Sequence, residues 1–282
     1  MILEKDADGN DHVLVRQSWW GTFTECNERG RLAIIDPDAD GEGDAAAAGT
    51  AAHAAIEECI NGTIAPSELK ANAELHAHRL LDTLNIEFKS FDHWQDLVSW
   101  AGKCAEAWGR DIWPKRPKGG RTEVPFKVRD LTRVDGVRVG ITGTIDLVLP
   151  NDLRDWKTSA RRYDEKKYQK NAHQPTFYSI AAVEGGLDVP WQYTWPMPFT
   201  YGVMVRNVKP TCQQFTVVRT EAHAAWLMHR IEQAVRMMLT LGLEKEWPTN
   251  DTSFLCSDRW CPWWDGCKGK YLSWHDDKLN VG

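Results

Sequence analysis

Two aspartates and a lysine lie close together in the middle of the chain, with a spacing that suits metal-dependent hydrolysis. If Asn151-Asp152 forms a two-residue hairpin loop, Asp146 faces Lys157 across the two strands, and Asp155 is the diagonal neighbour of Asp146. All three side chains then lie on one face. The two carboxylates stand about 7–8 Å apart at the backbone, a gap that a divalent cation between them can bridge.

Carboxylate oxygens are the ligands that Mg²⁺ or Mn²⁺ prefers, and the neighbouring Lys157 ammonium can orient or acidify a water molecule. This is the chemistry of phosphodiester hydrolysis. The alternative is a surface hairpin with a cross-strand Asp–Lys ion pair, worth well under ~1 kcal/mol. From the hairpin spacing alone, the surface hairpin is the more common outcome.

Positive charge gathers beside this segment, although the chain as a whole is acidic. The 34 Lys and Arg residues against 40 Asp and Glu residues give a net charge of −6, which excludes a general polyanion binder. Residues 154–170 nevertheless hold seven Lys or Arg against three Asp or Glu. Arg161 and Arg162 in this stretch are candidate contacts to a phosphate backbone, and the alternative is a solvated face.

Three of the seven cysteines crowd into twelve residues, as Cys256-x4-Cys261-x5-Cys267. Three such ligands normally require a fourth, and Cys26 is the best candidate. No export signal precedes the chain's first elements, so thiols or metal ligands are favoured over disulfides. Zinc in a tetrahedral Cys₄ site is one possible occupant. The remaining cysteines are expected to be buried apolar residues: Cys59, Cys104 and Cys212.

Hydrophobic periodicity predicts helices on both sides of a group of strands. Residues 1–17 are expected to be a flexible terminus. A helical layer is predicted over 51–61, with Thr50 as its cap, and over 67–85 and 93–112. Strands are predicted at 123–128, 137–149, 153–158, 192–195, 201–206 and 213–219, and further helices at 175–185 and 221–241. The odd-numbered apolar residues of 137–149 predict one buried face and one polar face.

Four short motifs, in this order, resemble those of the PD-(D/E)XK nucleases, and specifically of their RecB-like branch. They are Gly49-Thr-Ala-Ala-His53, Gly143-Thr-Ile-Asp146, Asp155-Trp-Lys157 and Gln174-Pro-Thr-Phe-Tyr178. The resemblance covers about residues 18–270. It implies an α/β fold with a restriction-endonuclease-like core, in which a central mixed sheet is flanked by helices.

The resemblance also assigns roles to individual residues. It implies that Asp146, Asp155, His53 and the backbone carbonyl of Trp156 bind Mg²⁺ or Mn²⁺, and that Lys157 is the catalytic lysine. It also implies that Gln174 and Tyr178 address DNA. The match of Glu123 to an accessory acidic residue of the family is looser. Tyr178 as a core residue remains the alternative.

The cysteine pattern resembles the iron–sulphur members of the same branch, including CRISPR-associated exonucleases and helicase–nucleases. Their first-cysteine segment is similar to Phe23-Thr-Glu-Cys26, and their last segment is similar to Cys261-Pro-Trp-Trp-Asp-Gly-Cys267. The more familiar family spacing is Cys-x2-Cys-x5-Cys, from which Cys256 departs. The resemblance implies a [4Fe–4S] cluster on Cys26, Cys256, Cys261 and Cys267, with structural zinc as the alternative.

Such a cluster would join the two ends of the chain, so one nuclease domain over 18–282 is expected, with a helical insertion at 63–122 and a Cys-rich clasp at 256–267 with Cys26. The predicted function is that of a cytoplasmic, metal-dependent DNA exonuclease acting on single strands or ends. Family members serve recombination, repair, phage replication or CRISPR adaptation, some with a helicase partner. One alternative is a noncatalytic nucleic-acid-binding or assembly module. Another is an iron–sulphur redox enzyme, for which the sequence shows no dinucleotide fingerprint.

Overall fold

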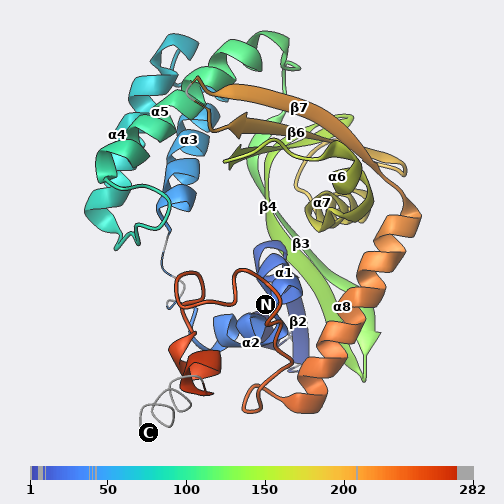
Figure 1. Cartoon of the computed structure of the whole chain (residues 1–282). Coiled ribbons are helices and arrows are strands. Elements are labelled where there is room, and N and C mark those ends of the chain that lie inside the picture. Colours follow the sequence, from blue (N-terminus) through green and yellow to red (C-terminus); the bar gives the residue numbers. More distant parts are fainter. Residues whose placement is uncertain are drawn as a thin grey trace, which may run out of the picture.

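The structure is a computed structural model and describes residues 2–5, 9, 11–37, 39, 41, 43–207 and 209–271. Within these residues, seven strands form one mixed sheet with helices on both faces, as the sequence predicts (Figure 1). The strands are β1 (Ile2–Lys5), β2 (Asp11–Arg16), β3 (Arg121–Val134), β4 (Val137–Leu149), β5 (Asp152–Ser159), β6 (Met197–Val205) and β7 (Thr211–Arg219).

The helices form two layers. One layer holds α3 (Asp44–Ile60), α4 (Leu69–Thr83) and α5 (Trp94–Asp111). The other face is covered by α6 (Glu165–Asn171), α7 (His173–Val183) and α8 (Glu221–Leu241), and α1 (Gln17–Glu25) and α2 (Asn27–Ile35) lie near the lower end of the sheet (Figure 1). Short turns of helix occur at Pro66–Glu68, Trp113–Lys115 and Asp265–Gly269. Each layer packs a separate hydrophobic core onto the sheet.

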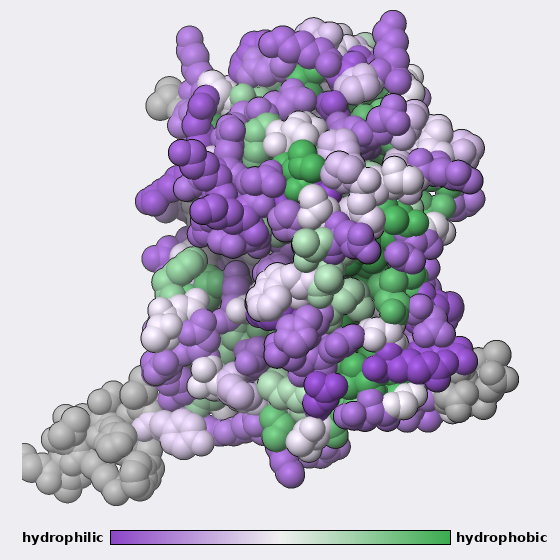
Figure 2. Space-filling view, turned by 90° about the vertical axis from the view of Figure 1, so that its right-hand side faces the viewer, coloured by the Kyte–Doolittle hydropathy of each residue, from purple (hydrophilic) through white to green (hydrophobic). Residues whose placement is uncertain are grey.

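The outer surface beyond α8 is polar. Figure 2 shows that hydrophilic side chains cover most of this face, with apolar side chains showing in patches between them. Among the described residues, no helix is both long and apolar enough to span a lipid bilayer.

Strand β4 organises the sheet because three other strands pair with it. Strand β3 pairs antiparallel along one edge, from Arg121–Val148 to Val134–Val137. The other edge is shared: β2 runs parallel to β4 as far as the Arg16–Thr142 pair, and β5 pairs antiparallel from Leu147–Arg154 onward. The sheet therefore splits between residues 142 and 147 of β4, where neither neighbour pairs with it.

The hairpin joining β4 and β5 has a two-residue loop, but the loop lies one position earlier than expected. Leu149 pairs with Asp152, so Pro150 and Asn151 form the loop. The predicted register, in which Asp146 faces Lys157, is therefore wrong: in the observed register Asp146 is level with Asp155. The two registers differ by an even number of positions, so the polar residues keep their common face.

The predicted alternation along β4 holds only for its first part. Val139, Ile141 and Ile145 join the core beneath α7 and α8, whereas Leu147 and Leu149 join the core beneath α3–α5. The exchange occurs at Asp146. On the neighbouring strand, Glu123 lies between the two residues paired with Ile145 and Leu147 and has a φ of 46°, which interrupts the regular pleat.

Three local predictions are wrong. Residues 11–16 are not flexible but form β2, in which Val13, Leu14 and Val15 are buried. Helix α3 begins at Asp44 rather than at Ala51, because the buried Asp44 carboxylate accepts hydrogen bonds from the backbone N–H groups of residues 89–91. No strand forms at 192–195. The domain is predicted to extend to residue 282, but residues 272–282 lie outside the described residues.

Two glycines allow close approaches that the site needs. A Cβ at Gly49 of α3 would lie 2.9 Å from Thr158 Oγ1 of β5, so the helix lies almost in contact with the strand there. A Cβ at Gly143 would lie 2.7 Å from the ring of Phe126, which is 2% exposed. Both glycines stand three or four residues before a predicted site residue, which gives a packing reason for the glycine in each motif.

We expect Gly143→Val to lower the free energy of unfolding by ~1–3 kcal/mol, because the side chain overpacks the core at Phe126. Urea denaturation measures this loss. Gly21→Ala is the matched control: it lies in α1 with no atom within 4 Å of the added Cβ, and it should be neutral or slightly stabilising. Equal stability of the two variants would contradict the steric explanation.

Candidate active site

The predicted carboxylates meet at the split in the sheet. Asp146 lies on the part of β4 beyond its last pair with β2 and before its first pair with β5. Its Oδ2 atom accepts a hydrogen bond of 2.7 Å from the backbone N–H of Trp156. The side chain thus makes the link between the strands where the regular ladder is absent, and this contact fixes the Asp146 carboxylate next to β5.

Asp155 lies beside it and is almost completely buried, with 1% of its side chain exposed. Its Oδ2 lies 2.6 Å from Lys157 Nζ, and its Oδ1 accepts a hydrogen bond of 2.9 Å from Gln174 Nε2. Apart from the ion pair with Lys157, Asp155 Oδ2 makes no hydrogen bond within the described residues. Gln174 also donates to the Tyr178 hydroxyl at 2.9 Å.

Tyr178 is therefore both a core residue and part of the site. It is 3% exposed and packs edge-on against Phe126, while its hydroxyl stands next to Gln174. The Gln-x-x-x-Tyr spacing places the two side chains one turn apart on α7, and together they hold Asp155 from the side of the second helical layer.

His53 approaches from the opposite layer. Its Nδ1 lies 3.6 Å from Asp146 Oδ2, and its ring contacts the backbone of Trp156. The close packing of α3 on β5 at Gly49 brings the next turn of the helix, and His53 with it, to the split. The four groups predicted as metal ligands are thus neighbours: His53, Asp146, Asp155 and the backbone of Trp156.

The charges of the site influence one another strongly. Burial, and then repulsion from Asp146, raises the pKa of Asp155. Burial by itself lowers the pKa of Lys157. The attraction of its ammonium to Asp155 and Asp146 is larger, so the pKa is raised overall. Burial and the nearby Lys157 lower the pKa of His53 to about 4, so the imidazole is neutral at pH 7 and retains a lone pair for a ligand.

Glu123 is the fifth ionisable group of the cluster. Partial burial, followed by repulsion from Asp146 and Glu57, raises the pKa of Glu123 to about 7. It lies level with Asp146 on β3, as the sequence analysis expected for an accessory acidic residue. Glu57 of α3 belongs to the same electrostatic group, because it contributes to the repulsion that raises the pKa of Glu123.

The donor set suits a hard divalent cation. Two carboxylates that repel each other, a neutral imidazole and a backbone carbonyl are ligands that Mg²⁺ or Mn²⁺ accepts. A cation would relieve the repulsion that raises the pKa of Asp155. Within the described part of the chain, however, no three His, Cys, Asp or Glu side chains already stand in a geometry that would hold a metal ion. The ammonium of Lys157 occupies the position beside Asp155 instead.

Two cavities flank the site, and Gln17 lines both. One, of about 310 Å³, opens next to Lys157 between α1, α6 and α7. The other, of about 800 Å³, lies along β3 and β4 and is lined by Arg16, Lys127, Thr142 and Thr144 among others. Gln17 is not among the predicted site residues, because residues 1–17 are expected to be a flexible terminus. The sequence signal for β2 is the apolar run Val13-Leu14-Val15, which is buried in the structure.

The predicted DNA-contacting arginines are less closely placed. Arg161 and Arg162 are exposed in the loop after β5 and line neither of these two cavities. The basic residue of this stretch that does line the cavity beside Lys157 is Lys167 of α6.

The four predicted cluster ligands come together at the other end of the molecule. One cavity of about 270 Å³ is lined by Cys26, Cys256, Cys261 and Cys267. In the sequence, Cys26 lies 230 or more residues before the other three. Burial raises the pKa of the Cys261 thiol, and the nearby Cys256 and Cys26 thiols add to this effect. Thiols are ligands that zinc and iron–sulphur clusters take, although in the described part of the chain no three of these cysteines already stand in a geometry that would hold a metal ion.

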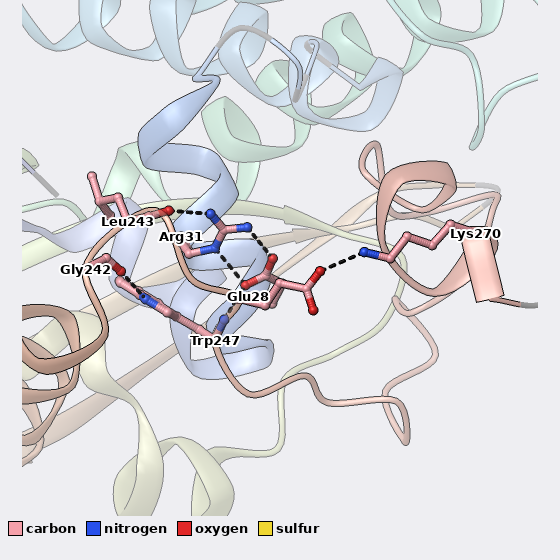
Figure 3. A network of polar contacts seen from close by, with 7 residues as sticks. Glu28, Arg31, Gly242, Leu243, Trp247 and Lys270 are labelled. Carbon is pink, nitrogen blue, oxygen red and sulfur yellow. Dashed lines mark hydrogen bonds and ion pairs between the residues drawn. The ribbon is translucent and has the colours of Figure 1, made fainter.

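Polar contacts tie the C-terminal segment to α2 (Figure 3). Arg31 forms an ion pair with Glu28 and donates to the carbonyl of Leu243. The second Glu28 oxygen accepts from the backbone N–H of Trp247 at 2.6 Å. Further along, Lys270 donates to Glu246 at 2.7 Å. These contacts bring the segment carrying the three late cysteines back to the helix pair that carries Cys26.

The chain belongs to the PD-(D/E)XK nuclease superfamily, whose family model matches residues 22–268. The fold is similar to the crystal structure of a protein named "Putative exonuclease" from Eubacterium rectale. The TM-score is 0.55 at 13% sequence identity, over 87% of this chain and 86% of that chain. No curated protein sequence matches the chain. The predictions of the superfamily and of its α/β fold are confirmed.

The raised pKa of Asp155 predicts a pH-dependent stability. The folded state holds this proton more tightly than the unfolded chain, where the Asp pKa is about 3.9. The free energy of unfolding of the metal-free protein should therefore fall as pH rises from about 4 towards 7. In Asp155→Asn this contribution is absent. As pH rises over this range, we expect the free energy of unfolding of the wild type to fall relative to that of the variant. Urea denaturation in EDTA measures both. A difference independent of pH would contradict the raised pKa.

Proposed function

We propose that the protein is a metal-dependent deoxyribonuclease that acts as an exonuclease on single-stranded DNA or DNA ends. The observation that carries the proposal is the convergence of Asp146, Asp155 and Lys157 at the split in the sheet. Membership of a nuclease superfamily gives that convergence its chemical meaning. The exonuclease name of the structural neighbour agrees with the proposal but shows only that the folds are alike.

The residues present fit a divalent cation. Asp146, Asp155, His53 and the carbonyl of Trp156 would hold Mg²⁺ or Mn²⁺, which supplies charge stabilisation at a phosphate and activates a water molecule when bound. Lys157 then serves as the ammonium that orients the water or neutralises the scissile phosphate. Gln174 keeps the Asp155 carboxylate aimed into the site through its hydrogen bond to Oδ1. Neutral His53 contributes no competing positive charge.

DNA as the substrate is supported by the basic loop and α6 beside the site. Arg161, Arg162 and Lys167 are exposed there and can follow a phosphate backbone, although the chain as a whole is acidic. The family resemblance extends the proposal to a cytoplasmic role in recombination, repair, phage replication or CRISPR adaptation, with a helicase or recombination protein as partner. A noncatalytic module would be expected to have lost an aspartate or the lysine, and the chain retains all three.

Substitution of the proposed catalytic groups tests this function. Asp146→Ala, Asp155→Ala and Lys157→Ala should each lower the cleavage rate of end-labelled DNA about 10²–10⁴-fold while DNA binding persists. Single- and double-stranded substrates with Mg²⁺, with Mn²⁺ or with EDTA give the metal requirement and the polarity in one series. Lys245→Ala, on a segment that lines neither cavity at the site, is the control. More than about a tenth of the wild-type rate in Asp155→Ala would remove the assignment.

We further propose that Cys26, Cys256, Cys261 and Cys267 hold a [4Fe–4S] cluster with a structural role. The four thiols around one cavity support a shared metal site, and the family resemblance favours iron and sulphide over zinc. The cluster would join α2 to the C-terminal segment, alongside the contacts that Glu28 and Arg31 already make. It would therefore stabilise the fold without taking part in hydrolysis.

Protein purified without oxygen should be brown and contain about four irons per chain. Cys261→Ala should lose the iron and melt at a lower temperature, and its activity should fall only in proportion to the folded protein. His53→Ala is the matched comparison, because it should keep the iron and the melting temperature but need more Mg²⁺ or Mn²⁺ for cleavage. Stoichiometric zinc without iron would favour the structural-zinc alternative, and loss of iron in His53→Ala would contradict the separation of the two sites.

A further inference from the structure

The cavity beside Lys157 has a composition that the hydrolytic chemistry does not require. Besides Lys157 of β5 and Gln174 of α7, which belong to the family motifs, it is lined by residues outside those motifs, contributed by α1, α6, α7, β6 and the loop after β5. Four aromatic residues line it: Trp20, Tyr163, Tyr168 and Tyr201. Around them stand polar side chains: Gln17, Asn171, His173 and Gln174.

The three tyrosines contact one another through their rings. Tyr163 and Tyr168 stack at a centroid distance of 4.2 Å and an interplanar angle of 14°. Tyr201 meets Tyr168 edge-on at 5.3 Å and is 1% exposed, so it supports the stack from the core. Tyr163 and Tyr168 themselves are only half-buried. A partly open aromatic surface is a platform on which a nucleobase can stack, whatever its sequence.

The polar groups suit the rest of a nucleotide. Asn171 and Lys167 are exposed at the cavity, and His173 is half-buried with its ring edge-on to Trp20 at 6.1 Å. Amide and imidazole groups can pair with base edges, and an ammonium can contact a phosphate. A volume of about 310 Å³ lies at the lower end of the range for small-ligand pockets.

The cavity on the other side of Gln17 differs in kind. Arg16, Thr142 and Thr144 give it a cationic and two hydroxyl groups, whereas Lys127 is ion-paired with Glu4 and Asp188 adds a carboxylate. The ring among its lining residues, Phe126, is 2% exposed and belongs to the core. The two cavities that share Gln17 therefore offer different partners to a bound strand: rings next to Lys157, and an arginine with hydroxyl groups along β3 and β4.

We propose that the aromatic cavity binds the base of one nucleotide directly next to the scissile phosphate, and that the strand on the other side is held by its backbone alone. The inference rests on the proposed function, because it takes DNA as the substrate. Tyr163 and Tyr168 both line the cavity and stack on each other, so removal of either ring breaks the platform, and Tyr168 of α6 is the one substituted in the test.

Single-stranded oligonucleotides with one abasic position test the inference. An abasic residue on one flank of the scissile phosphate should lower kcat/KM for wild-type protein roughly 5- to 150-fold, and the same change on the other flank should have little effect. In Tyr168→Ala the intact substrate should lose a similar factor, and the abasic residue should cause no further loss. Trp226→Ala, an exposed aromatic on α8 that lines neither cavity, should respond as the wild type does.

A binding measurement in EDTA separates this inference from the proposed function. An oligonucleotide carrying 2-aminopurine at the affected position should lose fluorescence on binding wild-type protein and Trp226→Ala, and should lose much less on binding Tyr168→Ala. Quenching without any metal-dependent cleavage would support the cavity and contradict the nuclease. Cleavage with equal abasic effects on both flanks, or quenching unchanged in Tyr168→Ala, would overturn the cavity. If Tyr168→Ala does not fold, the asymmetry between the flanks in the wild type decides.

Discussion

The site depends on one constraint in the sheet, which is that a single edge of β4 is shared by two strands. Strand β2 occupies the edge up to Thr142, and β5 occupies it from Leu147. Between them the backbone has no strand partner on that edge, and Asp146 uses its side chain to reach the N–H of Trp156. Helix α1 approaches β4 at Gly143, α3 approaches β5 at Gly49, and α7 reaches Asp155 through Gln174. Every proposed catalytic group lies where those elements meet.

The electrostatics of the site follow from this crowding. Two carboxylates and an ammonium are held with little water around them, and the carboxylates repel each other. Lys157 satisfies Asp155 in the absence of another cation. A buried arrangement of this kind contributes little to stability for its own sake, since the desolvation of the charges offsets their attraction. The fold maintains it through Gln174 and the Trp156 backbone, which is the pattern expected where a local cost serves a function.

Much of the fold could be predicted from the sequence because its signals are local. The bounds of 137–149 and 221–241 follow from periodicity and from the glycine after the helix, and both agree with β4 and α8. The motifs identified His53, Asp146, Asp155 and Lys157 as a group, and these residues do lie together.

The errors share a different cause, because the features concerned depend on distant parts of the chain. Helix α3 starts early because Asp44 binds the loop at 89–91, and β2 is ordered because it pairs with β4. The change of face at Asp146 lies opposite the positive φ of Glu123 on another strand. The aromatic cavity draws on four stretches of sequence, 17–21, 157, 163–174 and 201, so no single window contains it.

The parallel pairing of β2 with β4 also bears on how the chain is made. His12 pairs with Arg138, which is added to the chain 126 residues later. At about 5–20 residues per second, a ribosome reaches that partner roughly 6–25 s after it has made the first strand. During this interval Val13-Leu14-Val15 can pair only with β1, because β4 has not yet been made. Strand β2 is thus made early but can join the central sheet only late.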